Sequence, residues 1–146
     1  MQNHFAPIVG AWKLITFEFR KADGNVIYPF GERALGSIIY TESCRYSAQL
    51  MRIDRPKFTS GDQMKGTAEE IESNYKGCIS YFGTYEIDFE NSLIIHHVEA
   101  SIFPNMEGRD QERFFELSEN RLQLRTPPIK LDGEKAVGIL LWERIG

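Results

Sequence analysis

Residues 80–102 of the chain read SYFGTYEIDFENSLIIHHVEASI. Apolar and aromatic side chains alternate with polar ones on both sides of Glu90-Asn91, a pair typical of a turn. Alternation over four to eight residues is the pattern of a strand that buries one face. This stretch therefore predicts two antiparallel strands, over residues 80–87 and 93–102, joined by a short turn.

The same period of two continues outward over most of the chain. We expect further strands over residues 12–20, 26–28, 36–40, 45–51, 110–117, 121–126 and 134–144. About nine strands joined by short turns describe an antiparallel meander, which closes into a barrel because closure removes its exposed edges. The predicted fold class is all-β, with an antiparallel barrel of about eight to ten strands.

One segment departs from the strand period. Residues 52–66 contain proline, glycine and several charges, so we expect a loop there. The sequence TAEE at residues 67–70 is a capping box, in which the threonine is the N-cap of a helix. Ile71, Tyr75 and Cys78 follow at helical spacing, which predicts a short helix of about two to three turns with one apolar stripe.

Composition limits the classes of partner. The 146 residues fit one domain, which we expect to span residues 1–146. Seventeen basic and twenty-one acidic residues give a net charge of −4, which argues against nucleic acid and anionic membranes as partners. Aromatic residues make up 12% of the chain, which indicates an aromatic-rich globular domain and by itself no particular chemistry.

The chain carries no obvious targeting signal. Its first residues form neither a basic n-region nor an apolar h-region, and no apolar run approaches the ~18 residues of a membrane helix. Cys44 and Cys78 lie far apart and form no C-x-x-C motif, which favours two reduced thiols over a disulfide. We expect a cytoplasmic protein, and a homodimer would agree with base rates for oligomers.

Several short motifs occur in order along the chain. They are Gly10-x-Trp12, Tyr28-Pro29-Phe30-Gly31, Gly36-x-x-x-Tyr40, Gln49-Leu50-Met51-Arg52, Arg55-Pro56, Tyr81-Phe82-Gly83-x-Tyr85, His96-His97-Val98-Glu99, Phe103-Pro104-Asn105 and Leu141-Trp142-Glu143-Arg144. Together they resemble the small lipocalin-like domain family of stand-alone bacterial and fungal proteins, some encoded near secondary-metabolite genes. The resemblance covers roughly residues 8–144. It implies a calycin-type barrel with a central cavity, and it implies no particular reaction.

The candidate catalytic residues are His96, His97 and Glu99. Neighbouring residues of a strand point to opposite faces, so only one of the two histidines can face a cavity. Apolar neighbours of the same parity favour His96, although a polar pocket would invert this assignment. An imidazole in a closed pocket suits general acid–base chemistry. The alternative is a histidine that only completes a buried hydrogen-bonded cluster.

Metal and cofactor sites are not expected. Consecutive histidines on a strand cannot both bind one metal ion, and the third histidine, His4, is close to the terminus. The chain has neither a glycine-rich nucleotide-binding motif nor a nucleophile elbow. We therefore expect a protein that works without a metal or cofactor.

The candidate ligand-binding residues are Arg113, Tyr81, Tyr85, Phe115, Tyr46 and Arg52. Arg113 shares a face with Phe115, and a buried guanidinium must be paired, either with a carboxylate such as Glu99 or with an acidic ligand. The alternative is that Arg113 forms ion pairs on the outer surface of the sheet.

The remaining candidates belong to neighbouring strands and to the expected mouth of the barrel. Tyr81 and Tyr85 share a face with Gly83, which we expect to leave space in a pocket. Tyr46 comes from the preceding strand, and Arg52 precedes the loop near the mouth.

Two functions from different classes agree with these patterns. The first is a barrel that binds a small, largely apolar or aromatic molecule. The second is a cofactor-free isomerase, cyclase or dehydratase that acts on a small apolar substrate, either polyketide-like or terpenoid-like, in the same pocket. A filled barrel with a structural role is a third interpretation. The presence of an open cavity distinguishes the first two from the third.

Overall fold

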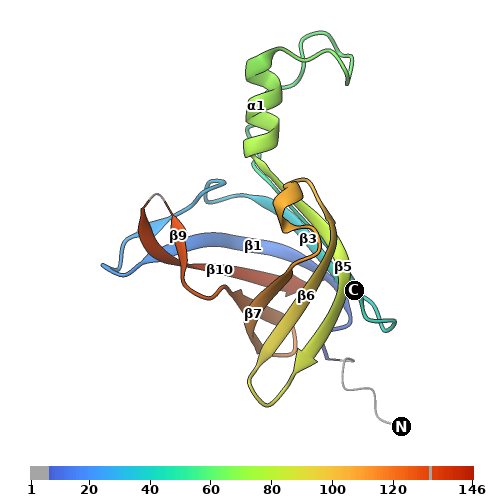
Figure 1. Cartoon of the computed structure of the whole chain (residues 1–146), viewed down its shortest axis with the longest axis vertical. Helices are drawn as coiled ribbons and strands as arrows, with labels where there is room; N and C mark the ends of the chain where they lie inside the picture. Colours follow the sequence, from blue (N-terminus) through green and yellow to red (C-terminus); the bar gives the residue numbers. More distant parts are fainter. Residues whose placement is uncertain (1–6, 132) are drawn as a thin grey trace.

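Eight of the ten strands close into an antiparallel barrel (Figure 1). The computed structural model describes residues 7–131 and 133–146. The barrel strands are β1 (Gly10–Lys21), β3 (Leu35–Tyr40), β4 (Arg45–Met51), β5 (Cys78–Asp88), β6 (Leu93–Ser101), β7 (Asp110–Leu117), β8 (Arg121–Arg125) and β10 (Glu134–Arg144). Pairing of β1 with β10 completes the ring. The predicted fold class is confirmed.

Two short strands lie outside the ring. β2 (Val26–Ile27) pairs with β1, and β9 (Ile129–Leu131) pairs with β10. The sequence predicted β2 but not β9, because Pro127 and Pro128 mark a break and only three residues follow before the next turn. The other strand predictions agree with the structure to within a few residues.

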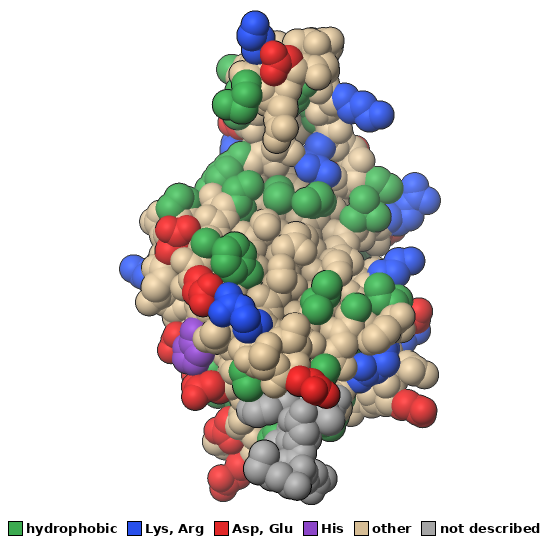
Figure 2. Space-filling model, turned by 90° about the vertical axis from the view of Figure 1, so that its right-hand side faces the viewer, with side chains coloured by type: hydrophobic (Ala, Val, Ile, Leu, Met, Phe, Trp, Pro, Cys, Tyr) green, Lys and Arg blue, Asp and Glu red, His purple; other side chains and the backbone are tan. Residues whose placement is uncertain are grey.

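The helix begins as predicted, but its packing differs from the prediction. α1 (Ala68–Lys76) is capped by Thr67, whose hydroxyl accepts a hydrogen bond from the amide of Glu70. The expected apolar stripe is wrong, because the helix ends at Gly77 and Cys78 already belongs to β5. The helix projects away from the barrel (Figures 1 and 2), which leaves Ile71 and Tyr75 exposed.

Two register shifts decide which side chains face the interior. In β1 a shift between Leu14 and Thr16 changes the inward set from Trp12 and Leu14 to Phe17 and Phe19. An inserted residue reverses the side-chain alternation of a strand. This explains why the strand carries apolar residues on both faces.

The second shift lies where β5 pairs with β6. Gly83 pairs with Val98 and Phe82 pairs with Ala100, so Glu99 is the extra residue. Beyond it, Ser101 faces the interior opposite Tyr81, whereas simple alternation predicted the outer face. A Cβ at Gly83 would collide with the carbonyl oxygen of His97. The expectation that this glycine leaves pocket space is therefore wrong, since it instead permits close backbone approach.

The surface carries charges of both signs. On the face in Figure 2, basic and acidic side chains are interspersed rather than gathered into one basic patch. Cys44 and Cys78 are both free thiols. Among the described helices, none is long and apolar enough to span a membrane.

Candidate functional site

The interior of the barrel contains a cavity of about 360 Å³. This volume lies at the lower end of the range of about 300–1,000 Å³ found for small-molecule pockets. Exposed side chains, among them Tyr75 of α1 and Phe103, line it on the side that reaches solvent. The barrel is therefore not filled by its own side chains, which distinguishes it from a purely structural barrel.

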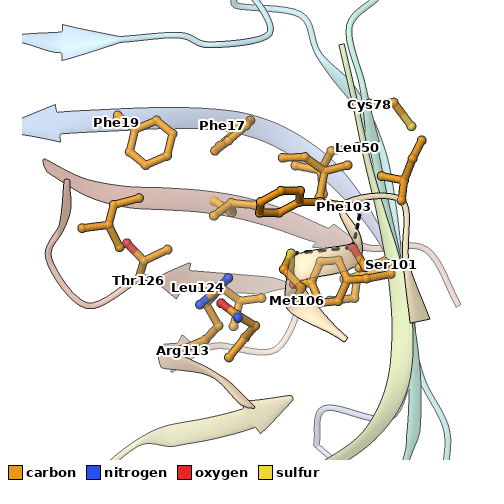
Figure 3. Close-up of a pocket in the computed structure, with 18 of the residues that line it drawn as sticks. Phe17, Phe19, Leu50, Cys78, Ser101, Phe103, Met106, Arg113, Leu124 and Thr126 are labelled. Carbon is orange, nitrogen blue, oxygen red and sulfur yellow. Dashed lines mark hydrogen bonds between the residues drawn. The ribbon is translucent and has the colours of Figure 1, made fainter. Parts of the chain in front are cut away.

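The wall of the cavity is mostly apolar and partly aromatic (Figure 3). Its apolar side chains come from nearly every barrel strand and from the 3₁₀ helix η1 (Pro104–Met106). They include Phe17, Phe19, Ile38, Leu50, Ile79, Phe103, Met106, Leu124, Leu140 and Trp142. Such a lining favours a ligand with an apolar body.

Arg113 is a charged side chain inside this apolar wall. It belongs to β7 and lines the cavity beside Leu124 and Thr126 (Figure 3). Its Nη1 donates a hydrogen bond of 2.7 Å to the backbone oxygen of the neighbouring Glu112. Within the described part of the chain, no carboxylate lies within ion-pair distance of its guanidinium. The predicted pairing with Glu99 is not formed.

His96 lies fully buried beneath the cavity wall, in a cluster of tyrosines. Its Nε2 is 2.7 Å from the hydroxyl of Tyr40, and its Nδ1 is 3.4 Å from the hydroxyl of Tyr81. The ring of Tyr46 stacks on the imidazole with centroids 4.2 Å apart. His96 itself does not line the cavity, whereas Tyr81 does. Tyr81 therefore connects the cavity to the buried imidazole.

Burial favours the uncharged forms of His96 and Tyr40. It lowers the pKa of His96 well below its usual value, and the positive charge of Arg113 lowers it further. Burial likewise raises the pKa of Tyr40 well above its usual value. A neutral imidazole can accept a hydrogen bond through one ring nitrogen and donate one through the other without placing a charge in the core.

His97 and Glu99 lie on the outer face, away from the cavity. His97 Nδ1 is 2.7 Å from Asp110, and its Nε2 is 3.0 Å from Glu86. These two carboxylates raise the pKa of His97. Glu99 accepts two hydrogen bonds from Arg45, of 3.1 and 2.7 Å, which lower the pKa of its carboxyl. The structure thus separates both residues from His96.

Four of the candidate ligand-binding residues contact other parts of the fold instead of the cavity. The hydroxyl of Tyr85 donates a hydrogen bond to the backbone oxygen of Thr41. The guanidinium of Arg52 donates one to the backbone oxygen of Pro29. Phe115 packs against the core, and Tyr46 stacks on His96. None of these four lines the cavity, whereas Arg113 and Tyr81 do.

The sequence did not predict Gln111, Ser101 or Thr126, which are among the polar side chains that line the cavity. Gln111 precedes Arg113 by two positions and so shares its face, a signal that alternation offered. Ser101 was hidden by the register shift in β6, and Thr126 follows the end of β8. In the described ranges, no three metal-ligating side chains converge, and His4 lies outside those ranges.

Comparison with known proteins places this barrel in a family. Residues 9–145 match a family described as a lipocalin-like domain. The chain is also 31% identical over 106 residues to a 4′-hydroxy-3′-methoxypropiophenone carrier protein of Aspergillus oryzae. That similarity covers 68% of this chain and 96% of the carrier protein. With its closed barrel and its internal cavity, the chain belongs to the lipocalin-like domain family.

Proposed function

We propose that this protein binds a small aromatic molecule in its barrel cavity and acts as a binding or carrier protein. The observation that carries the proposal is a cavity of about 360 Å³ with an aromatic and aliphatic wall and few polar groups. Aromatic side chains favour aromatic ligands through edge and offset ring contacts. The name of the similar Aspergillus oryzae carrier, whose cargo is an aromatic ketone, supports the same class of ligand.

A cavity-filling substitution tests this proposal. Leu124→Trp replaces an aliphatic side chain of the cavity wall with a larger indole ring. It should weaken binding of 4′-hydroxy-3′-methoxypropiophenone at least tenfold. The matched control is Gln123→Trp, because the neighbouring position on β8 does not line the cavity. That variant should stay within twofold of the unmodified protein. Isothermal titration calorimetry measures both affinities, and circular dichroism checks that the variants fold.

Two results would contradict the proposal. One is a failure of the unmodified protein to bind any small aromatic probe, this compound and plain propiophenone included. The other is equal affinity of the Leu124→Trp variant, since that would mean that the compounds bind elsewhere.

A second candidate function is acid–base catalysis by Tyr81. Its support is that Tyr81 lines the cavity while its hydroxyl lies 3.4 Å from Nδ1 of His96. In this proposal the phenol of Tyr81 gives its proton to the carbonyl oxygen of a bound substrate, water removes the α-proton, and a proton from water restores the phenol. His96 would act through Tyr81, and the outward His97 and Glu99 would take no part.

Hydrogen–deuterium exchange at the α-carbon of propiophenone tests the catalytic candidate. If Tyr81 protonates the carbonyl oxygen while water removes the α-proton, the resulting enolisation should raise the exchange rate in heavy water above that of buffer, as followed by proton NMR. Tyr81→Phe removes the hydroxyl and should lower the added rate at least tenfold while changing the Kd less than threefold. An exchange rate equal to that of buffer alone would remove this candidate.

A further inference from the structure

The charged side chains that line the cavity carry one sign. Arg113 and Lys76 are both positive, and no aspartate or glutamate occurs among the described lining residues. The chain as a whole has four more acidic than basic residues, so this local excess runs against the overall charge. The positive charge of the cavity lining therefore does not follow from the net charge of the chain, which is negative.

The two positive charges differ in their freedom to meet a ligand. Lys76 is an exposed residue at the C-terminal end of α1, and its Nζ is 2.8 Å from the carboxylate of Glu72. Arg113 has no such partner within the described residues, and its one hydrogen bond goes to the backbone oxygen of Glu112. A guanidinium has five N–H donors, so most of those of Arg113 remain for other acceptors. Arg113 is thus the charge available inside the cavity.

Other polar groups of the cavity are also donors. The hydroxyl of Thr126 already accepts a hydrogen bond of 2.8 Å from the amide of Gly138, which leaves its proton free to donate. A lining with spare donors suits a ligand that brings acceptor oxygens.

A neutral ligand would leave the guanidinium of Arg113 desolvated and without a charged partner. Filling the cavity with an apolar body removes water from the guanidinium, and a desolvated charge without a partner costs free energy. An anionic oxygen group restores that loss through charge-assisted hydrogen bonds, which are often bidentate with arginine. The same site would reject a ligand that carries a positive charge.

We infer that the ligand of this cavity is an aromatic anion, a ring that carries a carboxylate or another ionised oxygen group, held by Arg113. The inference rests on the proposed binding function and adds the charge of the ligand to it. The apolar wall around Phe17, Leu50 and Leu124 accommodates the ring, while Arg113 on β7 fixes the anionic end.

A matched pair of probes tests this inference. Sodium cinnamate and methyl cinnamate share their ring and chain and differ in the charge of the oxygen group. At neutral pH the unmodified protein should bind cinnamate at least tenfold more tightly than the ester, as measured by isothermal titration calorimetry. Arg113→Gln should reverse the preference, because the acid then loses its water without gaining a cation.

Arg125→Gln is the charge-matched control. The guanidinium of Arg125 lies 5.5 Å from the ring centroid of Phe114, and Arg125 does not line the cavity. The substitution removes the same unit of charge, so it should leave the preference for cinnamate within twofold of the unmodified value. Arg113→Lys keeps the charge without the planar fork and should retain part of the preference.

The outcomes separate the charge of the ligand from the binding of aromatic molecules itself. Ester binding equal to or tighter than acid binding in the unmodified protein overturns the anionic ligand but leaves aromatic binding intact. A preference for the acid that survives in Arg113→Gln, with ester binding retained as proof of folding, overturns the role of Arg113. If that variant does not fold, loss of the preference in Arg113→Lys alone overturns the role of the charge. Binding of neither probe, nor of the propiophenones, removes the proposed function itself.

Discussion

Replacing Trp12 by alanine is expected to lower the free energy of unfolding by about 3–5 kcal/mol. The side chain is fully buried, and its Nε1 donates a 2.9 Å hydrogen bond to the backbone oxygen of Ile8. The guanidinium of Arg144 lies 4.2 Å from the ring centroid, so the ring also joins β1 to the end of β10. Urea unfolding followed by circular dichroism measures the loss.

Trp12→Phe separates the contribution of packing from that of the hydrogen bond. It keeps an aromatic ring but removes the N–H donor, which leaves the Ile8 oxygen without this partner. We expect a smaller loss, of about 1–2 kcal/mol. A loss below about 1 kcal/mol in Trp12→Ala would contradict the assigned role, because it would mean that the ring does not support the closure between the first and last barrel strands.

The two adjacent histidines should affect stability in opposite directions as pH changes. His96 has a lowered pKa in the folded state, so below about pH 6.5 the unfolded chain binds more protons than the folded one. Stability therefore falls as the pH falls, by about 1.4 kcal/mol per pH unit until the folded-state pKa is reached. His97 has a raised pKa, so its contribution is present at low pH and is lost as the pH rises through that value.

Variants of each histidine identify the source of this dependence. Urea unfolding between pH 5 and pH 8 should show that His96→Gln removes the acid-side loss, although the variant is less stable at pH 8. His97→Gln should leave the slope below pH 6.5 unchanged, because the pairing of His97 with Asp110 and Glu86 is complete there. An acid-side slope that persists in His96→Gln would assign the linkage to another group.

Side-chain alternation predicted the barrel because strands that bury one face repeat every two residues. The same rule placed His96 inward and separated it from His97, as the structure has them. It failed beyond Glu99 in β6 and at Leu14 in β1, where an extra residue reverses the alternation. A bulge is a backbone feature that leaves little mark on residue type. For this reason alternation alone places Ser101 on the wrong face.

The cavity was harder to predict than the strands. Arg113 and Tyr81 line it, but the sequence could not tell that His96 lies one layer deeper, because depth depends on how the tyrosines pack around it. Glu99 was a reasonable partner for Arg113 by chemistry alone. The partner of Glu99 is instead Arg45 of β4, and this ion pair crosses the intervening strand β5 on the outside of the barrel.

Closure of β1 on β10 also has a consequence for the order of events during folding. Leu140 and Trp142 of β10 form part of the cavity wall, so the pocket is complete only after strands from distant parts of the chain have paired. Pairings of such long sequence separation form slowly. An intermediate without this seam would be an open sheet with two free edges and half a pocket. A ligand that needs the complete wall therefore stabilises the closed barrel and not the open intermediate. Its binding favours the last step of folding, the pairing of β1 with β10.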